Sequence, residues 1–173
     1  MRSFTLLITT LSLIACEPKE EDQYTFVLED ELGNPSGCSD FLFFDSNEDD
    51  SIVLEFQGQG LAEAAHTNGE AQTIEYDLEE LPEELRLEVN FGTNLSQALC
   101  NDALDPTIES VVDTSYIPVN GTLNILVTPN GEPSEFGEYP AEIQIQIQQA
   151  DFCAEVREGE PHHENCFNVS SYS

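Results

Sequence analysis

The sequence predicts an all-β fold: an antiparallel β-sandwich of about eight or nine strands, with very little helix and with disulfide bonds. Three observations support this prediction. Apolar and polar residues alternate in many short segments, Asn-Gly and Asn-Pro pairs separate these segments, and four cysteines follow an apparent export signal. We expect less than about 15% helix, against roughly 30–35% in an average globular domain.

The predicted strands are short and follow one another along the chain. The alternation is clearest in residues 85–91, where four apolar side chains share one face and polar or charged residues stand between them. This pattern is typical of a strand with one buried face. The expected strands span residues 24–28, 41–44, 52–56, 74–78, 85–91, 116–119, 123–127, 143–147 and 167–169.

Turn and capping residues indicate how these segments are connected. Asn120-Gly121 separates two predicted strands. Asn-Gly is preferred in two-residue hairpin loops because both central residues need a positive φ, so we predict a hairpin there. Helix is expected only in residues 60–66 and in residues 94–103, where Asn94 would serve as the N-cap.

The first sixteen residues have the pattern of an export signal. Arg2 gives a positive start, residues 4–14 form an uncharged and mostly apolar run, and Leu13-Ile14-Ala15-Cys16 closes it. The run is too short for a membrane span, which needs about 20 residues. Its closing segment resembles the lipobox of bacterial lipoproteins, in which the cysteine is lipidated and becomes the first residue of the mature protein.

This resemblance implies an organisation and a location. Residues 1–15 would be the signal peptide, residues 16–22 the lipidated Cys16 with an acidic tether, and residues 23–173 a single domain. The partner would be a lipid membrane of the cell envelope. In enterobacterial lipoproteins an Asp after the cysteine favours the inner membrane, so Glu17 favours the outer membrane. In the alternative reading, an ordinary signal ends at Ala15 and leaves Cys16 as a free thiol.

Four cysteines remain once Cys16 is assigned to the lipid anchor. In an exported protein they suggest two disulfides, for which three pairings exist. Cys153 and Cys166 are thirteen residues apart, which suits a local closure, and Cys38 would then pair with Cys100. A metal site is the alternative, but the chain has no Cys-x-x-Cys motif.

Two short motifs around cysteines carry a second resemblance. Gly37-Cys38-Ser39-Asp40 and Leu99-Cys100-Asn101-Asp102 resemble segments of uncharacterised secreted lipoproteins. The similarity covers about half of the chain and implies an exported lipoprotein, without implying a molecular function.

The charge of the chain is strongly one-sided. It contains 35 Asp and Glu residues but only four Lys and Arg residues, for a formal net charge of −31. Such a field repels nucleic acid, whose binding requires cationic side chains, and attracts cations and basic partners. Because basic residues are scarce throughout the chain, we favour a diffuse, hydrated surface adapted to salty water over a dedicated store of cations.

One loop motif suggests a ligand. Asp45, Asn47 and Asp49 have the spacing of a calcium-binding loop, in which alternate oxygen groups converge on one cation. The motif departs from an EF-hand because Asp50 replaces the usual glycine at position six and Phe56 replaces the glutamate at position twelve. A polar hairpin loop is therefore the preferred interpretation, and calcium is the alternative.

The sequence contains no motif that indicates catalysis. It has neither a Gly-x-Ser-x-Gly nucleophile motif nor a phosphate-binding glycine loop. We therefore expect a membrane-anchored bacterial envelope lipoprotein that has a highly acidic, non-catalytic β domain and no cofactor, and whose protein or glycan partner is unidentified. The alternative is a calcium-dependent adhesive or carbohydrate-binding module.

Overall fold

The computed structural model describes residues 27–38, 42–100, 107, 109–135, 139–157 and 160–173. Strands account for 57% of the structure and helices for 14%, which confirms the predicted all-β class. In chain order the elements are α1 (Leu28–Glu31), β1 (Asn34–Cys38), β2 (Leu42–Ser46), β3 (Ile52–Gly58), α2 (Leu61–Asn68), β4 (Gln72–Asp77), η1 (Leu78–Glu80), β5 (Leu85–Thr93), η2 (Ser96–Ala98), β6 (Val111–Pro118), β7 (Thr122–Pro129), β8 (Ala141–Arg157) and β9 (Glu160–Tyr172).

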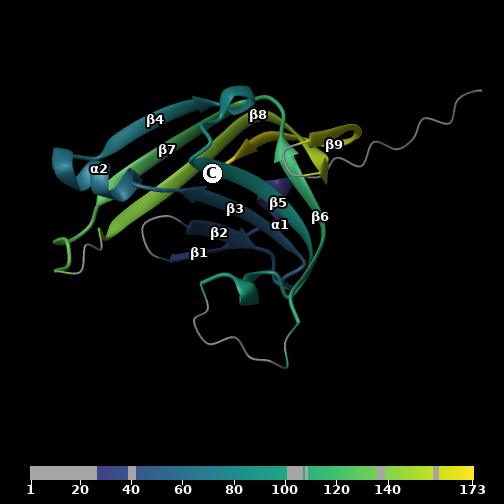
Figure 1. Cartoon of the computed structure of the whole chain (residues 1–173), viewed down its shortest axis with the longest axis horizontal. Helices are drawn as coiled ribbons and strands as arrows, with labels where there is room; N and C mark the ends of the chain where they lie inside the picture. The colour runs from purple at the N-terminus through teal and green to yellow at the C-terminus, as the bar shows by residue number, and fades with distance from the viewer. Residues whose placement is uncertain (1–26, 39–41, 101–106, 108, 136–138, 158–159) are drawn as a thin grey trace, which may run out of the picture.

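The strands form one antiparallel sheet that curls into a half-barrel (Figure 1). The order across the sheet is β1-β2-β3-β5-β6-β8-β7-β4, and β9 pairs with β8. In Figure 1, β4, β7 and β8 cross the top of the molecule, and β1, β2 and β3 lie below them. The predicted sandwich of two separate sheets is therefore not confirmed, because the two packed halves belong to one continuous sheet.

The hairpin predicted at Asn120-Gly121 is wrong. In β6, Pro118 lies opposite Phe152 of β8, and in β7, Thr122 lies opposite Gln148 of the same strand. Both pairings have the same register, so β6 and β7 lie end to end along one edge of β8. The Asn-Gly pair therefore separates two strands that run in the same direction, and it does not reverse the chain.

Local hydrogen bonds explain why the chain bends here without turning back. The Asn120 side chain donates to Asp151 Oδ2 at 2.7 Å and accepts from the Asp151 N–H at 2.8 Å. Gly121 has a φ of 105°, and Gln149 of the facing strand has a φ of 51°. Both strands are therefore irregular at the same level. Since β5 pairs with β6 and β4 pairs with β7, this level divides the two halves of the sheet.

The main core fills the space between these two halves. It combines the inward side chains of β3 and β5 with those of β7, β8 and β9. Leu28 of α1, Leu32 directly after α1, and Leu61 and Ala65 of α2 complete it. A smaller cluster of Phe44, Val53 and Leu95 lies on the other face of β2 and β3. The central members of the main core are Leu54, Phe56, Leu87, Val89, Leu123, Ile125, Val127, Ile145, Ile147, Phe152 and Val169.

Most of the other predicted elements are present, with three local differences. Residues 60–66 lie in α2 as expected, apart from their first residue. Leu28 belongs to α1 and not to a strand, because it and Leu32 both point into the core one helical turn apart, and residues 24–26 lie outside the described part of the chain. Asn94 is not a cap: it has a φ of 53°, and η2 begins after Leu95. Strand β1 was not predicted, since it contains Pro35 and Gly37.

Both disulfides join the predicted partners. Cys38 at the end of β1 is bonded to Cys100 after η2, and Cys153 is bonded to Cys166 directly across the β8–β9 pair. A loop as short as that between Cys153 and Cys166 stabilises the fold by about 3 kcal/mol in the chain-entropy model. No helix in the described ranges is long and apolar enough to cross a membrane.

The bend at Gly121 gives a test of this architecture. A Cβ added to Gly121 would lie 2.6 Å from the Ala150 Cα, which is backbone and cannot move aside cheaply. We expect Gly121→Ala to lower the free energy of unfolding by about 2–4 kcal/mol, as measured by urea denaturation. Gly131→Ala is the matched control, because Gly131 has a similar φ but the nearest atom to its added Cβ would be 3.6 Å away. Equal losses in the two variants would contradict the close β7–β8 approach at this bend.

Candidate functional site

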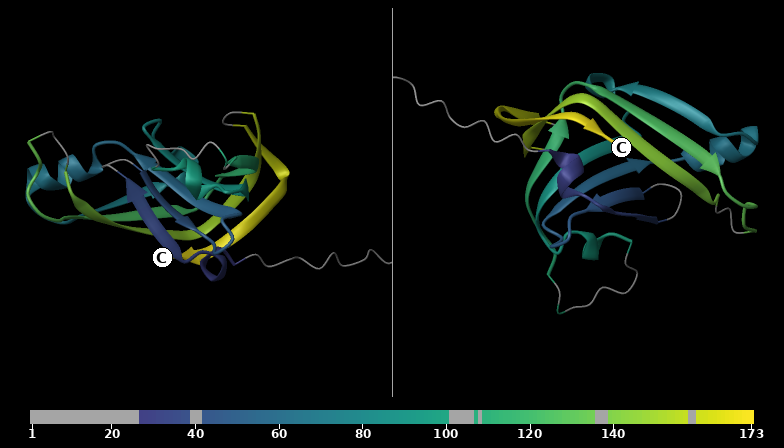
Figure 2. Two further views of the ribbon diagram at one scale, coloured as in Figure 1. Left: turned by 90° about the horizontal axis from the view of Figure 1, so that it is seen from below. Right: turned by 180° about the vertical axis from the view of Figure 1, so that it is seen from behind.

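The curled sheet leaves an open seam between β1–β2 and β8. Pairing between β8 and β9 ends where Ile147 lies opposite Tyr172. In the described structure, residues 141–146 of β8 therefore pair with β7 on one edge and with no strand on the other. At the seam, one edge of β8 is therefore unpaired, although farther along its length β8 has a neighbouring strand on each side (Figure 2).

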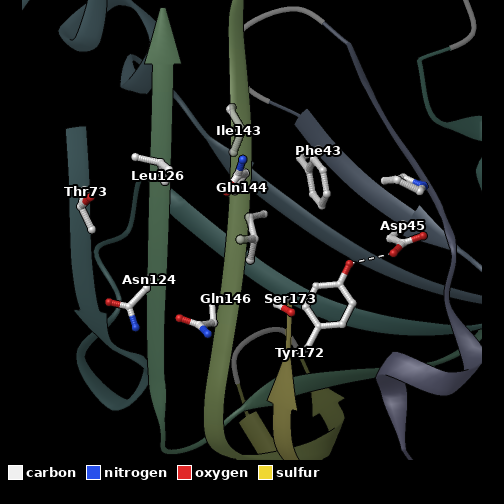
Figure 3. A pocket seen from close by; sticks show the side chains of 12 residues that line it. Phe43, Asp45, Thr73, Asn124, Leu126, Ile143, Gln144, Gln146, Tyr172 and Ser173 are labelled. Atoms are coloured by element: carbon white, nitrogen blue, oxygen red, sulfur yellow. Dashed lines mark hydrogen bonds between the residues drawn. The ribbon is translucent and has the colours of Figure 1, made fainter. Parts of the chain in front are cut away.

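A cleft of about 620 Å³ follows this seam (Figure 3). On one side, β4, β7 and β8 present uncharged polar groups from Thr73, Asn124, Gln144 and Gln146. On the other side lie Phe43 of β2, Pro35 of β1 and the C-terminal Tyr172 and Ser173. The cleft therefore combines hydrogen-bonding side chains with aromatic and aliphatic surface, although the chain as a whole is strongly acidic.

The Asp45 side chain connects the two sides of the seam by hydrogen bonds. Its Oδ1 accepts hydrogen bonds from the Gly33 N–H at 3.1 Å and the Asn34 N–H at 2.7 Å. Its Oδ2 accepts one from the Tyr172 hydroxyl at 2.8 Å, across 127 positions of sequence. Asp45 is 6% exposed and Tyr172 is 5% exposed. Burial, together with the adjacent Asp45 carboxylate, raises the pKa of Tyr172 above its usual value, so the hydroxyl remains a donor at neutral pH.

The three residues of the predicted calcium loop take part in two different arrangements. Asp45 faces Tyr172 at the cleft, whereas Asn47 and Asp49 both bond to Ser51 in the β2–β3 turn. The Asp49 carboxylate accepts from the Ser51 hydroxyl at 2.6 Å, which holds the pKa of Asp49 below its usual value. Within the described ranges, no three His, Cys, Asp or Glu residues are grouped so that they could hold a metal ion. Calcium binding by Asp45, Asn47 and Asp49 thus remains a prediction, and these hydrogen bonds do not add to its support.

Asp50, beside this motif, has a feature that the spacing did not indicate. Its Oδ1 accepts from the Ser96 N–H at 2.9 Å, but its Oδ2 is buried without a hydrogen-bond partner in the described structure. Asp50 lines a shallow polar hollow of about 460 Å³ that also includes Asn34 and Asn47. Asp50 has a φ of 58°. The buried position of its Oδ2 therefore depends on the left-handed backbone of the turn, which the Asp45-Asn47-Asp49 spacing does not indicate.

A second buried polar group lies away from the cleft, on β3 and β5. Glu55 and Glu88 lie directly opposite each other and are 8% and 6% exposed. Arg86 forms an ion pair with Glu88 at 2.7 Å, and Gln57 donates to Glu55 at 2.6 Å. Burial raises the pKa of Glu55, and the negative charge of Glu88 raises it further, while the bond from Gln57 opposes them. The two carboxyls therefore have different environments despite their symmetrical positions.

The residues of the cleft come from six strands that are distant in sequence. The alternation of Ile143, Gln144, Ile145 and Gln146 predicts a strand with one polar face, and that strand is present. Nothing in the pattern shows that this polar face lies beside Phe43 and Tyr172. The sequence therefore predicted the strand β8, which lines one side of the cleft, but it did not predict the cleft.

Removal of the Tyr172 hydroxyl would test the bond across the seam. We expect Tyr172→Phe to lower the free energy of unfolding by about 1.5–3 kcal/mol, because the buried Asp45 Oδ2 would lose its donor. Tyr116→Phe is the control: the Tyr116 hydroxyl makes an exposed and long bond of 3.4 Å to Asn165. Its loss should cost less than about 0.5 kcal/mol in the same urea titration. Similar effects in both variants would show that the Asp45 bond does not close the seam.

The raised pKa of Glu55 predicts a pH dependence of stability. The folded state binds the Glu55 proton more tightly than the unfolded state, whose pKa is near 4.5. The contribution of Glu55 to the free energy of unfolding therefore falls as the pH rises from about 4.5 through the raised folded value. Glu55→Gln should be more stable than the parent at pH 7, and this difference should shrink at pH 4.

Glu75→Gln controls for the change in net charge, since Glu75 is an exposed residue of β4. Urea titrations of the parent and both variants at constant ionic strength provide the comparison. A gain in Glu75→Gln as large as in Glu55→Gln would assign the effect to diffuse repulsion instead of burial.

Comparison of the chain with protein-family models, curated proteins and solved structures found no match. The residues that bear on function are the lipobox-like segment that ends at Cys16 and the lining of the cleft.

Proposed function

We propose that the protein is a lipid-anchored bacterial envelope lipoprotein whose β domain binds a partner without catalysing a reaction. The anchor rests on the lipobox-like segment Leu13-Ile14-Ala15-Cys16, which lies outside the described residues. A single acyl chain gives only marginal membrane binding, so lipoproteins of this class use more than one. The acidic segment after Cys16 then separates the domain from the membrane surface.

The observation that carries the binding role is the cleft at the seam. Its volume of about 620 Å³ lies within the range of about 300–1,000 Å³ that is common for ligand sites. Polar side chains such as Asn124, Gln144 and Gln146 can orient a ligand, while Phe43 and Leu126 provide apolar contact. A mixed lining of this kind is the usual composition of a binding site.

The chemistry of the same lining supports a non-catalytic role. The described residues around the cleft include no histidine and no cysteine. The carboxylate among them, Asp45, already accepts hydrogen bonds from three donors. The Tyr172 hydroxyl is held in its neutral form by burial and by Asp45. Both groups are therefore engaged with each other and with the backbone, which favours a structural role for them over contact with a substrate.

The charge of the chain narrows the class of partner. A net charge of −31 disfavours nucleic acids and anionic lipid surfaces, and it favours neutral or basic ligands. Because the polar wall of the cleft is uncharged, we assign its hydrogen-bonding groups to ligand contact and the surrounding acidity to solubility and long-range attraction.

The anchor is tested by the mass of the mature protein. We expect the N-terminal peptide to begin at Cys16 and to carry a diacylglycerol thioether, and the protein to partition into the detergent phase. Cys16→Ser should retain its signal or appear in the aqueous phase. Ser12→Ala alters the same apolar run but leaves Leu13, Ala15 and Cys16 in place, so it should be lipidated normally. An unmodified Cys16 thiol in the mature parent would overturn the proposal.

A further inference from the structure

The cleft is built along the edge of a strand and not only on its face. Ile143, Gln144, Ile145 and Gln146 are consecutive in β8, and all four line the cleft. Successive side chains of a strand point to opposite faces, so a cavity that contacts all of them must run beside the backbone. That backbone edge is the one that β9 leaves unpaired after Tyr172. The cleft therefore contains main-chain donors and acceptors without a strand partner in the described structure.

This edge lacks the features that normally block strand addition. Exposed edges are commonly protected by proline, lysine or a bulge. Across the seam, β1 contains Pro35 and Gly37, which disfavour a regular strand ladder. The stretch from Glu142 to Gln146 has no proline, no lysine and no glycine, and its pairing with β7 is regular. It is therefore a regular template for another strand, and its one charged residue, the acidic Glu142, would repel acidic strands but attract basic ones.

We propose that the free edge of β8, from Glu142 to Gln146, binds an extended peptide segment of another protein as an added strand. This inference rests on the proposed binding role of the cleft and names the partner. The added strand would continue the line of β9 beyond Tyr172 and fill the seam. At about 3.4 Å per residue, five or six residues of peptide would span the free edge. Main-chain hydrogen bonds would provide affinity, as in other cases of strand addition.

The two sides of the cleft define the chemistry of the peptide. One set of alternate peptide side chains would contact Phe43 and Ile145, so these residues should be apolar. The other set would lie over the outer face, which carries Gln144 and Gln146 together with the exposed carboxylates of Glu75 and Glu142. Basic residues match that face and the overall charge of −31. The expected ligand is therefore an extended segment of alternating apolar and basic residues.

Charge also argues against a second copy of this chain as the occupant. Pairing of two β8 edges would bring together two molecules that each carry a charge of −31. A basic peptide gains from the same field that separates two copies. Self-association is therefore treated as a competing outcome of the test.

The experiment uses the mature lipoprotein in neutral detergent and three synthetic seven-residue peptides. The first peptide is Lys-Val-Lys-Ile-Lys-Val-Lys. The second replaces its central isoleucine with proline, which keeps the charge but cannot form a regular strand ladder. The third replaces all lysines with glutamates. Calorimetry at physiological salt should show binding of the first peptide at least about tenfold tighter than of the second, and no binding of the third.

A pair of variants locates the site. Gln146→Lys introduces a protecting lysine on the free edge and should weaken binding of the first peptide at least about tenfold. Gln148→Lys makes the same change on the same face, but Gln148 lies opposite Ser171 of β9 and does not line the cleft. It should weaken binding less than about threefold. Hydrogen exchange of the parent should slow at amides within Glu142–Gln146 when the first peptide is added.

Three results would overturn the inference. Equal affinity for the first two peptides would mean that diffuse charge alone attracts them. Equal weakening by Gln146→Lys and Gln148→Lys would place binding elsewhere. Protection of Glu142–Gln146 without peptide, together with dimers in sedimentation, would identify a second copy as the occupant. Absence of binding by all three peptides would also overturn the inference. That result has no bearing on the lipid anchor, which is tested separately by the mass of Cys16.

Discussion

The carboxylate of Asp45 is the contact on which the shape of the seam depends. One oxygen receives two backbone N–H groups from the residues that lead into β1, and the other receives the hydroxyl of Tyr172 at the end of β9. A curled sheet that does not close into a barrel has two edges that nothing in its own ladder holds together. A buried, charge-assisted hydrogen bond supplies that connection at one point and leaves the remaining length of the seam open as a cleft.

The curl itself arises where β6 gives way to β7. Both strands follow the same edge of β8, but Asn120 and Gly121 break the line between them, and Gln149 breaks β8 at the same level. Asp151 accepts hydrogen bonds from Asn120 and Asn168, which lowers its pKa and ties this bend to β9. The two halves of the sheet can then face each other and bury one core between them. The bend and the core are therefore parts of one arrangement.

The distribution of polar groups separates solubility from recognition. Acidic residues are spread over the chain, whereas the polar wall of the cleft is made of Thr73, Asn124, Gln144 and Gln146. The buried carboxyls of Glu55 and Glu88 are instead satisfied locally by Gln57, Arg86 and Asn90. This uncharged polar wall thus differs from the acidic composition of the chain as a whole, which supports its assignment as the contact surface for a partner.

The sequence by itself determined the all-β class and the location of most strands, and it favoured, among three possible pairings, the two disulfides that the structure contains. These features follow from local alternation, from helix and turn preferences and from the short separation between Cys153 and Cys166. Tertiary structure alone decided that Asn120-Gly121 bends a strand instead of closing a hairpin, because Asp151 and Leu78 provide partners that no local pattern reveals. It also decided that Asp45 bonds to Tyr172 and that the β8 edge borders a cleft. Both depend on contacts between segments more than one hundred residues apart, and such contacts are set by how the whole sheet curls.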